Sequence, residues 1–148
     1  MKVTNIAGLD CARIILGTGR FGGAIDEGAA FELMDVYIEA GGNVIDTAEV
    51  YGDWFPDVEK SPSEKLVGRY LRQRGSSGLI VFTKGAHYRI KDPARVSRVR
   101  PECIREDLEK SLETLRLTAL NCTGSTGTIP PIRSNRLWTL FLRRRTGA

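Results

Sequence analysis

The chain has 148 residues, of which 41% are hydrophobic and 27% charged, and its formal net charge is +4. No apolar stretch approaches the roughly 20 residues of a membrane-spanning helix, and the first five residues lack a signal-peptide apolar region, so we expect a cytoplasmic protein with no membrane partner. A net positive charge suggests a nucleic-acid partner. Here the excess lies wholly in residues 118–148, which carry five Arg and no acid, while residues 1–117 have a net charge of −1. We therefore predict no nucleic-acid partner.

The first predicted unit is a strand followed by a helix. Residues 13–17 are a short apolar run, and a glycine-rich loop follows. Apolar side chains then recur at helical spacing until Gly41 and Gly42 end the helix. These side chains are Phe31, Leu33, Met34, Tyr37 and Ile38.

The second unit has the same order. Residues 43–46 form the strand, and a helix begins after Ser61-Pro62-Ser63-Glu64. Ser61 is predicted to cap the helix, Pro62 to occupy its first position, and Glu64 to complete a capping box. Gly75 is expected to end this helix.

The third unit completes the pattern. Residues 79–82 are continuously apolar, as expected for a strand of a parallel sheet covered on both faces, and Thr83-Lys84 follows. Pro101 opens a helix with one apolar stripe, made by Ile104, Leu108, Leu112 and Leu115. Three strand–helix repeats predict an α/β fold with a parallel sheet or barrel.

Polar residues at strand ends are the candidate site, because ligands of such folds bind outside the carboxyl ends of the strands. Asp46 ends the second strand, Lys84 ends the third, and Tyr51 lies in the loop after Asp46. Each has a structural alternative: a turn residue, a solvated strand end, or loop packing. Cys11, Cys103 and Cys122 form no C-x-x-C pair, so we predict neither a disulfide framework nor a metal site.

The order of the motifs resembles the aldo-keto reductase family over residues 11–117. Four segments carry the resemblance: LGTGRFGG at 16–23, VIDTAEVYG at 44–52, SEKLVG at 63–68 and FTK at 82–84. The resemblance implies an incomplete (β/α)8 TIM barrel, of which residues 1–117 supply about the first three β/α units. It also implies NADPH-dependent reduction of a small-molecule aldehyde or ketone.

The resemblance further implies a role for each matching residue. Tyr51 would be the general acid that protonates the carbonyl oxygen, Lys84 the cation beside it, and Asp46 the carboxylate that pairs with Lys84. A neighbouring cation favours the phenolate and so makes the hydroxyl a better proton donor. Gly19 and Arg20, together with Asp46, would bind the cofactor near its nicotinamide ribose.

Residues 118–148 depart from the family pattern. The family's fourth catalytic residue is a His in a run such as Leu-Tyr-Trp-Leu-His-Arg-Asp-Asp, and His87, the only histidine, lies in the wrong place and is predicted to be a loop residue. Inserting one base after the codon of Leu117 permits the translation Leu-Asp-Cys-Ile-Glu-Leu-Tyr-Trp-Leu-His-Arg-Asp-Asp-Pro. We therefore hypothesise that residues 118–148 are an unstructured, out-of-frame tail and that the chain is a truncated, inactive fragment.

Several alternatives remain open. Gly17-Thr18-Gly19-Arg20-Phe21-Gly22 matches the G-x-G-x-x-G pattern of a Rossmann-type dehydrogenase, with Asp46 at about 20 residues as its ribose-binding acid. A second alternative is a non-catalytic binding or regulatory protein on a reductase scaffold. Trp54 is either a wall of the substrate pocket or loop packing. The sequence indicates no particular oligomeric state.

Overall fold

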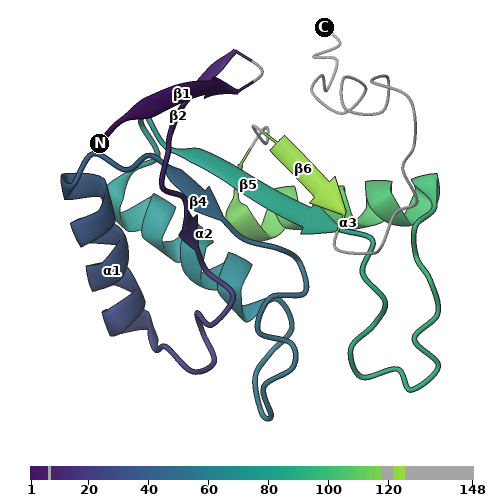
Figure 1. Cartoon of the computed structure of the whole chain (residues 1–148). Helices are drawn as coiled ribbons and strands as arrows, with labels where there is room; N and C mark the ends of the chain where they lie inside the picture. Colours follow the sequence, from purple (N-terminus) through teal and green to yellow (C-terminus); the bar gives the residue numbers. More distant parts are fainter. Residues whose placement is uncertain (7, 118–121, 126–148) are drawn as a thin grey trace, which may run out of the picture.

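A computed structural model describes residues 1–6, 8–117 and 122–125. Its main sheet has four strands, all parallel, in the order β3-β4-β5-β6. These strands are β3 (Leu16–Gly17), β4 (Val44–Asp46), β5 (Ile80–Gly85) and β6 (Cys122–Ser125). The helices between them are α1 (Glu27–Glu39), α2 (Pro62–Arg74) and α3 (Pro101–Leu115), and Figure 1 shows α2 and α3 on one face of the sheet.

The strand order distinguishes the two fold predictions. The strands lie side by side in the order in which they occur along the chain, as in a barrel, whereas a Rossmann sheet has the order 3-2-1-4. Gly22 lies in a loop with a φ of 71°, and α1 begins only at Glu27, after an Asp26 side chain that accepts a hydrogen bond from the Ala29 amide. The Rossmann alternative is therefore wrong, and the part of the chain described here is an incomplete (β/α)8 barrel.

Four residues of the segment predicted to be unstructured form a strand. Strand β6 pairs in parallel with β5, with Phe82 opposite Cys122 and Gly85 opposite Ser125. The N–H and C=O groups on the outer side of β5 need partners, and this pairing supplies them. The expectation of an unstructured tail is therefore wrong for residues 122–125, and the remainder of that tail lies outside the described residues.

An antiparallel hairpin that the sequence did not predict precedes the barrel strands. It consists of β1 (Val3–Ile6) and β2 (Leu9–Ala12). The Asn43 side chain joins the hairpin to the amino end of β4, accepting from the Ala12 amide at 2.8 Å and donating to the Asp10 carbonyl at 2.8 Å. The hairpin therefore lies at the amino end of the sheet, opposite to the end that carries Asp46 and Lys84.

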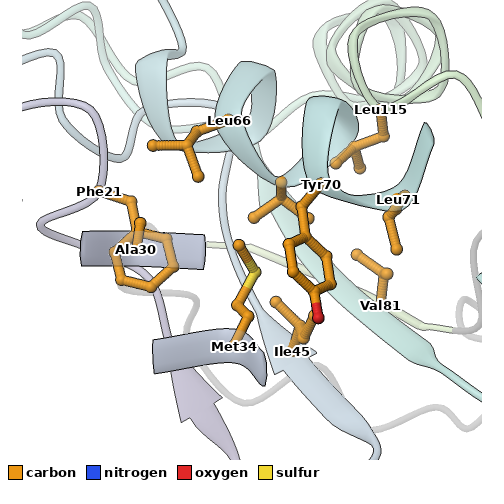
Figure 2. Close-up of a cluster of buried hydrophobic side chains, with 10 residues drawn as sticks. Phe21, Ala30, Met34, Ile45, Leu66, Tyr70, Leu71, Val81 and Leu115 are labelled. Carbon is orange, nitrogen blue, oxygen red and sulfur yellow. The ribbon is translucent and has the colours of Figure 1, made fainter. Parts of the chain in front are cut away.

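The main core lies between the sheet and the helices (Figure 2). Its side chains come from every β/α unit, and the fully buried members include Met34 of α1, Ile45 of β4, Leu66 of α2 and Leu115 of α3. Helix α2 approaches α3 closely, because a Cβ on Gly68 would lie 2.7 Å from the Thr114 carbonyl oxygen. Helices α2 and α3 therefore pack against each other, and all three predicted helices contribute side chains to one core.

The predicted capping box at the start of α2 does not form. Ser61 has a left-handed backbone (φ 55°, ψ 46°) and makes no side-chain cap, and its amide instead donates to Asp53 Oδ1 at 2.7 Å. Glu64 points into the protein, where it is fully buried and accepts a hydrogen bond from Thr83 Oγ1 at 2.5 Å. Its Oε2 atom has no hydrogen-bond partner among the described residues.

Burial raises the pKa of Glu64 to about 7. The hydrogen bond from Thr83 lowers the pKa, while the charges of Glu49 and Asp107 raise it further. The folded form therefore holds a proton that the unfolded chain releases near its ordinary value of 4.5. The contribution of Glu64 to folding stability is therefore greatest below pH 4.5, and it is lost as the pH rises through about 7.

We predict that Glu64→Gln stabilises the chain at pH 8, by on the order of 2–3 kcal/mol, because the amide removes the cost of ionising a buried carboxyl. At pH 4.5 the two proteins should have similar stability. Urea unfolding at both pH values measures the difference. Glu32→Gln, at an exposed position of α1, is the control, and equal stability changes at both pH values for Glu64→Gln would contradict the prediction.

Candidate active site

The candidate catalytic residues meet at the carboxyl ends of β4 and β5. Lys84 Nζ donates to both carboxylate oxygens of Asp46 at 2.7 Å, to the Thr47 carbonyl at 2.8 Å and to Tyr51 Oη at 3.0 Å. The same ammonium lies 4.6 Å from the centroid of the Tyr51 ring. The structure thus brings together all three residues that the sequence singled out.

Parallel pairing places these side chains at one edge of the sheet. Asp46 is opposite Phe82 in the register of β4 and β5, and Lys84 lies two residues further along β5. The loop after β4 continues along β5, because the Thr47 amide donates to the Phe82 carbonyl at 2.8 Å and the Glu49 amide to the Lys84 carbonyl at 3.0 Å. This loop carries Tyr51 to the Lys84 ammonium.

The ion pair is partly accessible. The Lys84 and Asp46 side chains are 24% and 25% exposed, so solvent or a ligand reaches a charge pair that is otherwise enclosed by protein. An ammonium offers three donor hydrogens, and the four acceptor atoms around Lys84 occupy them all. The phenol of Tyr51 is therefore held beside a fixed positive charge.

A buried hydroxyl cluster lies behind the site, and the sequence analysis missed it. Ser63 Oγ is 2.7 Å from Thr18 Oγ1 and 3.0 Å from Thr47 Oγ1, and all three residues are fully buried. Ser63 Oγ also donates to the Thr18 carbonyl, and the Ser63 amide donates to the Tyr51 carbonyl at 3.4 Å. The cluster joins the segments that follow β3 and β4 to the start of α2. Its only sequence signal is that each of these residues lies directly beside a predicted strand end or helix start.

Two of the three predicted cofactor-binding residues, Gly19 and Arg20, follow β3, and the third, Asp46, ends β4. The Thr18 amide and hydroxyl both hydrogen bond to the Asp46 carbonyl at 3.0 Å, which brings this segment against the end of β4. A Cβ on Gly19 would lie 4.0 Å from Tyr51 Cδ2, so Gly19 is beside the Tyr51 ring, and Arg20 is exposed. Phe21 is buried in the core and anchors the segment.

Trp54 lies beside Tyr51. The two rings make an edge-to-face contact with centroids 6.0 Å apart, and Trp54 is 46% exposed. Gly52 between them has a φ of 92°, and a Cβ there would lie 2.3 Å from Pro62 Cγ, so the turn that places Trp54 requires glycine. An exposed aromatic ring therefore borders the Tyr51 ring.

A separate pocket of about 200 Å³ lies between the loops that follow β4 and β5. Glu49, whose side chain is 4% exposed, pairs there with Lys60 and with Arg89. His87 is in the second loop, where its Nδ1 atom hydrogen bonds to the Tyr88 carbonyl, and it is not among the hydrogen-bond partners given above for the Lys84 ammonium. His87 is thus a loop residue, as predicted.

None of the helices among the described residues is long and apolar enough to cross a membrane. Nor do His, Cys, Asp and Glu side chains of that part of the chain gather in a group of three or more that could hold a metal ion.

A model of the aldo/keto reductase family matches residues 13–123. The chain belongs to this family. It is 38% identical over 86 residues to an uncharacterized 11.2 kDa protein of Pseudescherichia vulneris, covering 57% of this chain and 84% of that protein.

Longer relatives share the same region. A norsolorinic acid reductase of Emericella nidulans is 32% identical over 124 residues, covering 75% of this chain and 30% of the relative. An aryl-alcohol dehydrogenase [NADP(+)] of Phanerodontia chrysosporium is 40% identical over 63 residues, covering 42% of this chain and 14% of the relative. The chain therefore spans less than a third of either enzyme.

The fold is also found in a solved structure, the holo form of an aldo-keto reductase from Bacillus halodurans. The TM-score is 0.69 at 24% identity, covering 84% of this chain and 40% of the other. The described strands and helices thus correspond to part of a barrel of this family. The family is one of oxidoreductases, as the sequence predicted.

We predict that Ser63→Ala destabilises the chain by about 1–3 kcal/mol, because it leaves the buried hydroxyls of Thr18 and Thr47 without their shared partner. Thermal unfolding of the variant measures the loss. Ser77→Ala, at an exposed position, is the matched control. Ser63→Ala and Ser77→Ala proteins of equal stability would show that the cluster does not hold the loop segments in place.

Proposed function

We propose that the residues around Lys84 are the proton-donating half of an NADP(H)-dependent active site that reduces an aldehyde or ketone to an alcohol. The observation that carries the proposal is the Lys84 ammonium, which donates to both Asp46 and Tyr51 Oη. A phenol beside a fixed ammonium is suited to general acid catalysis. The relative from Phanerodontia chrysosporium is named as an aryl-alcohol dehydrogenase with NADP(+), which supports the choice of cofactor.

In this mechanism Tyr51 hydrogen bonds to the carbonyl oxygen and transfers its proton to that oxygen. A bound NADPH would supply the hydride for the carbonyl carbon, and with the proton from Tyr51 the product would be an alcohol and a Tyr51 phenolate. Lys84 stabilises the phenolate through the 3.0 Å hydrogen bond. Asp46 holds the ammonium beside Tyr51 through two hydrogen bonds of 2.7 Å.

The segment after β3 fits the proposed cofactor site. No atom lies within 4 Å of a Cβ built on Gly17, and the nearest to one built on Gly19 is on the Tyr51 ring, so a ligand can approach the backbone there. Arg20 is exposed and cationic, as suits a ligand with phosphate groups. We assign Gly19, Arg20 and Asp46 to cofactor binding.

Trp54 is our proposed wall of the substrate pocket. Its exposed ring next to Tyr51 offers an apolar surface to the carbon skeleton of a carbonyl compound. We therefore propose a small-molecule substrate. We also propose a cytoplasmic location, and neither a nucleic-acid nor a membrane partner.

We also propose that a single-base deletion after the codon of Leu117 separates the family sequence from residues 118–148. The family match covers residues 13–123 and so ends only six residues after Leu117, and the sequence after Leu117 contains no His. The chain as written would then be a truncated fragment without turnover. Sequencing the coding DNA from Glu113 to Pro130 tests this, because an additional base there would restore the family's frame.

The functional test compares the chain as written with the product of a gene into which one base has been inserted after the Leu117 codon. We expect the frame-restored protein to oxidise NADPH in the presence of an aromatic aldehyde, and the chain as written to show no turnover. Tyr51→Phe in the frame-restored protein should lower kcat about 100- to 10,000-fold, the usual contribution of a general acid. Phenylalanine keeps the ring that contacts Trp54 and removes only the hydroxyl.

Tyr88→Phe, in the loop after β5, is the matched control and should keep its rate. A frame-restored protein in which Tyr51→Phe reduces aldehydes at the parent rate would contradict the proposal. NADPH binding without turnover would instead support the alternative of a non-catalytic protein built on a reductase scaffold.

A further inference from the structure

A buried ion pair that contacts no catalytic residue lies directly behind the end of β5. Asp107 of α3 is 1% exposed and Arg98 is 8% exposed. Arg98 Nη1 donates to Asp107 Oδ2 at 2.6 Å and Nη2 to Oδ1 at 2.8 Å, so the guanidinium binds the carboxylate with two parallel hydrogen bonds. The pair is neither on the surface nor part of the site described above.

The same carboxylate holds the turn after Lys84. Asp107 Oδ2 accepts a hydrogen bond from the Ala86 amide at 2.8 Å. Ala86 is buried and has a φ of 62°, a left-handed conformation that costs a non-glycine residue free energy. Gly85 before it leaves room for this approach, because a Cβ there would lie 2.8 Å from Asp107 Cβ. The turn therefore depends on a bond from α3.

Arg98 fixes the far end of the same loop. Its Nη1 atom also donates to the His87 carbonyl at 3.3 Å, although His87 and Arg98 are separated by ten residues of chain. The Asp107 carboxylate thus holds both ends of the segment between β5 and α3, because it binds Ala86 at one end and Arg98 at the other. Burial alone would raise the pKa of Asp107, but the hydrogen bonds from Arg98 and Ala86 outweigh it and the pKa lies below its ordinary value.

Such a pair is not needed for stability alone. Taking two charges out of water costs free energy, and apolar residues of similar volume often replace a buried ion pair without loss. What an apolar pair could not supply is an acceptor for the Ala86 amide at a defined position. The ionic pair is therefore best explained by the geometry that it imposes on the residues after Lys84.

We infer that Arg98 and Asp107 are positioning residues, which fix the left-handed turn at Ala86 and so hold the Lys84 ammonium against Asp46 and Tyr51. The inference rests on the role proposed for Lys84. It requires that the end of β5 be held on both sides. The Glu49 amide bonds to the Lys84 carbonyl on the side of the site, and Asp107 bonds to the backbone two residues later on the side of α3.

The test observes the Lys84 ammonium directly, in a ¹H–¹⁵N correlation spectrum of the lysine side chains of the 148-residue chain. An ammonium held by protein acceptors exchanges its protons slowly enough to give a signal, and Lys84→Arg identifies that signal by its loss. In Asp107→Ala we expect the Lys84 signal to broaden or disappear. Adding Ala86→Gly should restore it in part, because glycine adopts the positive φ without help from Asp107.

Asp35→Ala is the matched control. Asp35 accepts from Tyr70 Oη at 2.7 Å and from Arg74 Nη2 at 3.1 Å, so its loss also breaks a hydrogen-bonded ion pair between helices, away from β5. This variant should lose stability and keep the Lys84 signal. A role confined to stability would give the same spectrum for both variants once both are folded.

A folded Asp107→Ala protein with an unchanged Lys84 signal would overturn the inference. Should that variant not fold, Arg98→Lys provides the same comparison, because it keeps the positive charge and removes the two-pronged bond. Turnover is not part of this measurement. Failure of the proposed reduction would therefore contradict the proposed function and leave the result on Lys84 intact.

Discussion

Strands β4 and β5 pair in parallel with Asp46 opposite Phe82, and the other features of the site depend on this register. It brings the carboxylate at the end of one strand within 2.7 Å of the ammonium near the end of the next. A shift of one residue would turn Lys84 to the other face of the sheet, because side chains alternate along a strand. The loop that carries Tyr51 depends on the same alignment, since its amides bond to the carbonyls of Phe82 and Lys84.

The apolar pattern was sufficient to predict three strands, three helices and their parallel arrangement. Residues such as Met34, Ile45, Leu66 and Leu115, which recur with the period of their element, form the observed core. The pattern could not predict the β1–β2 hairpin, because every residue of its first strand is exposed and no buried face repeats along it. It also could not predict β6, because the pairing of residues 122–125 depends on the neighbouring β5.

Some of the important polar residues could likewise be predicted from the sequence, and others could not. Asp46, Tyr51 and Lys84 could be found because they occur in order within recognisable motifs, and the structure brings them together. Glu64 was misassigned, because a Glu three residues after a Ser fits a capping box equally well, whether it faces solvent or the protein interior. Asp107 is in the middle of a helix with no local sign of burial, and its importance depends on Arg98 and Ala86, which are distant in sequence.

The order of the strands has a consequence for how the chain assembles. Each strand of the main sheet pairs with the one synthesised immediately before it, and paired residues such as Leu16 and Ile45, or Ile45 and Val81, are 29 and 36 residues apart. No strand must wait for a later one to be inserted between two earlier ones. The sheet can therefore grow from its amino-terminal side as the polypeptide leaves the ribosome, with each new β/α unit docking on a surface that is already formed.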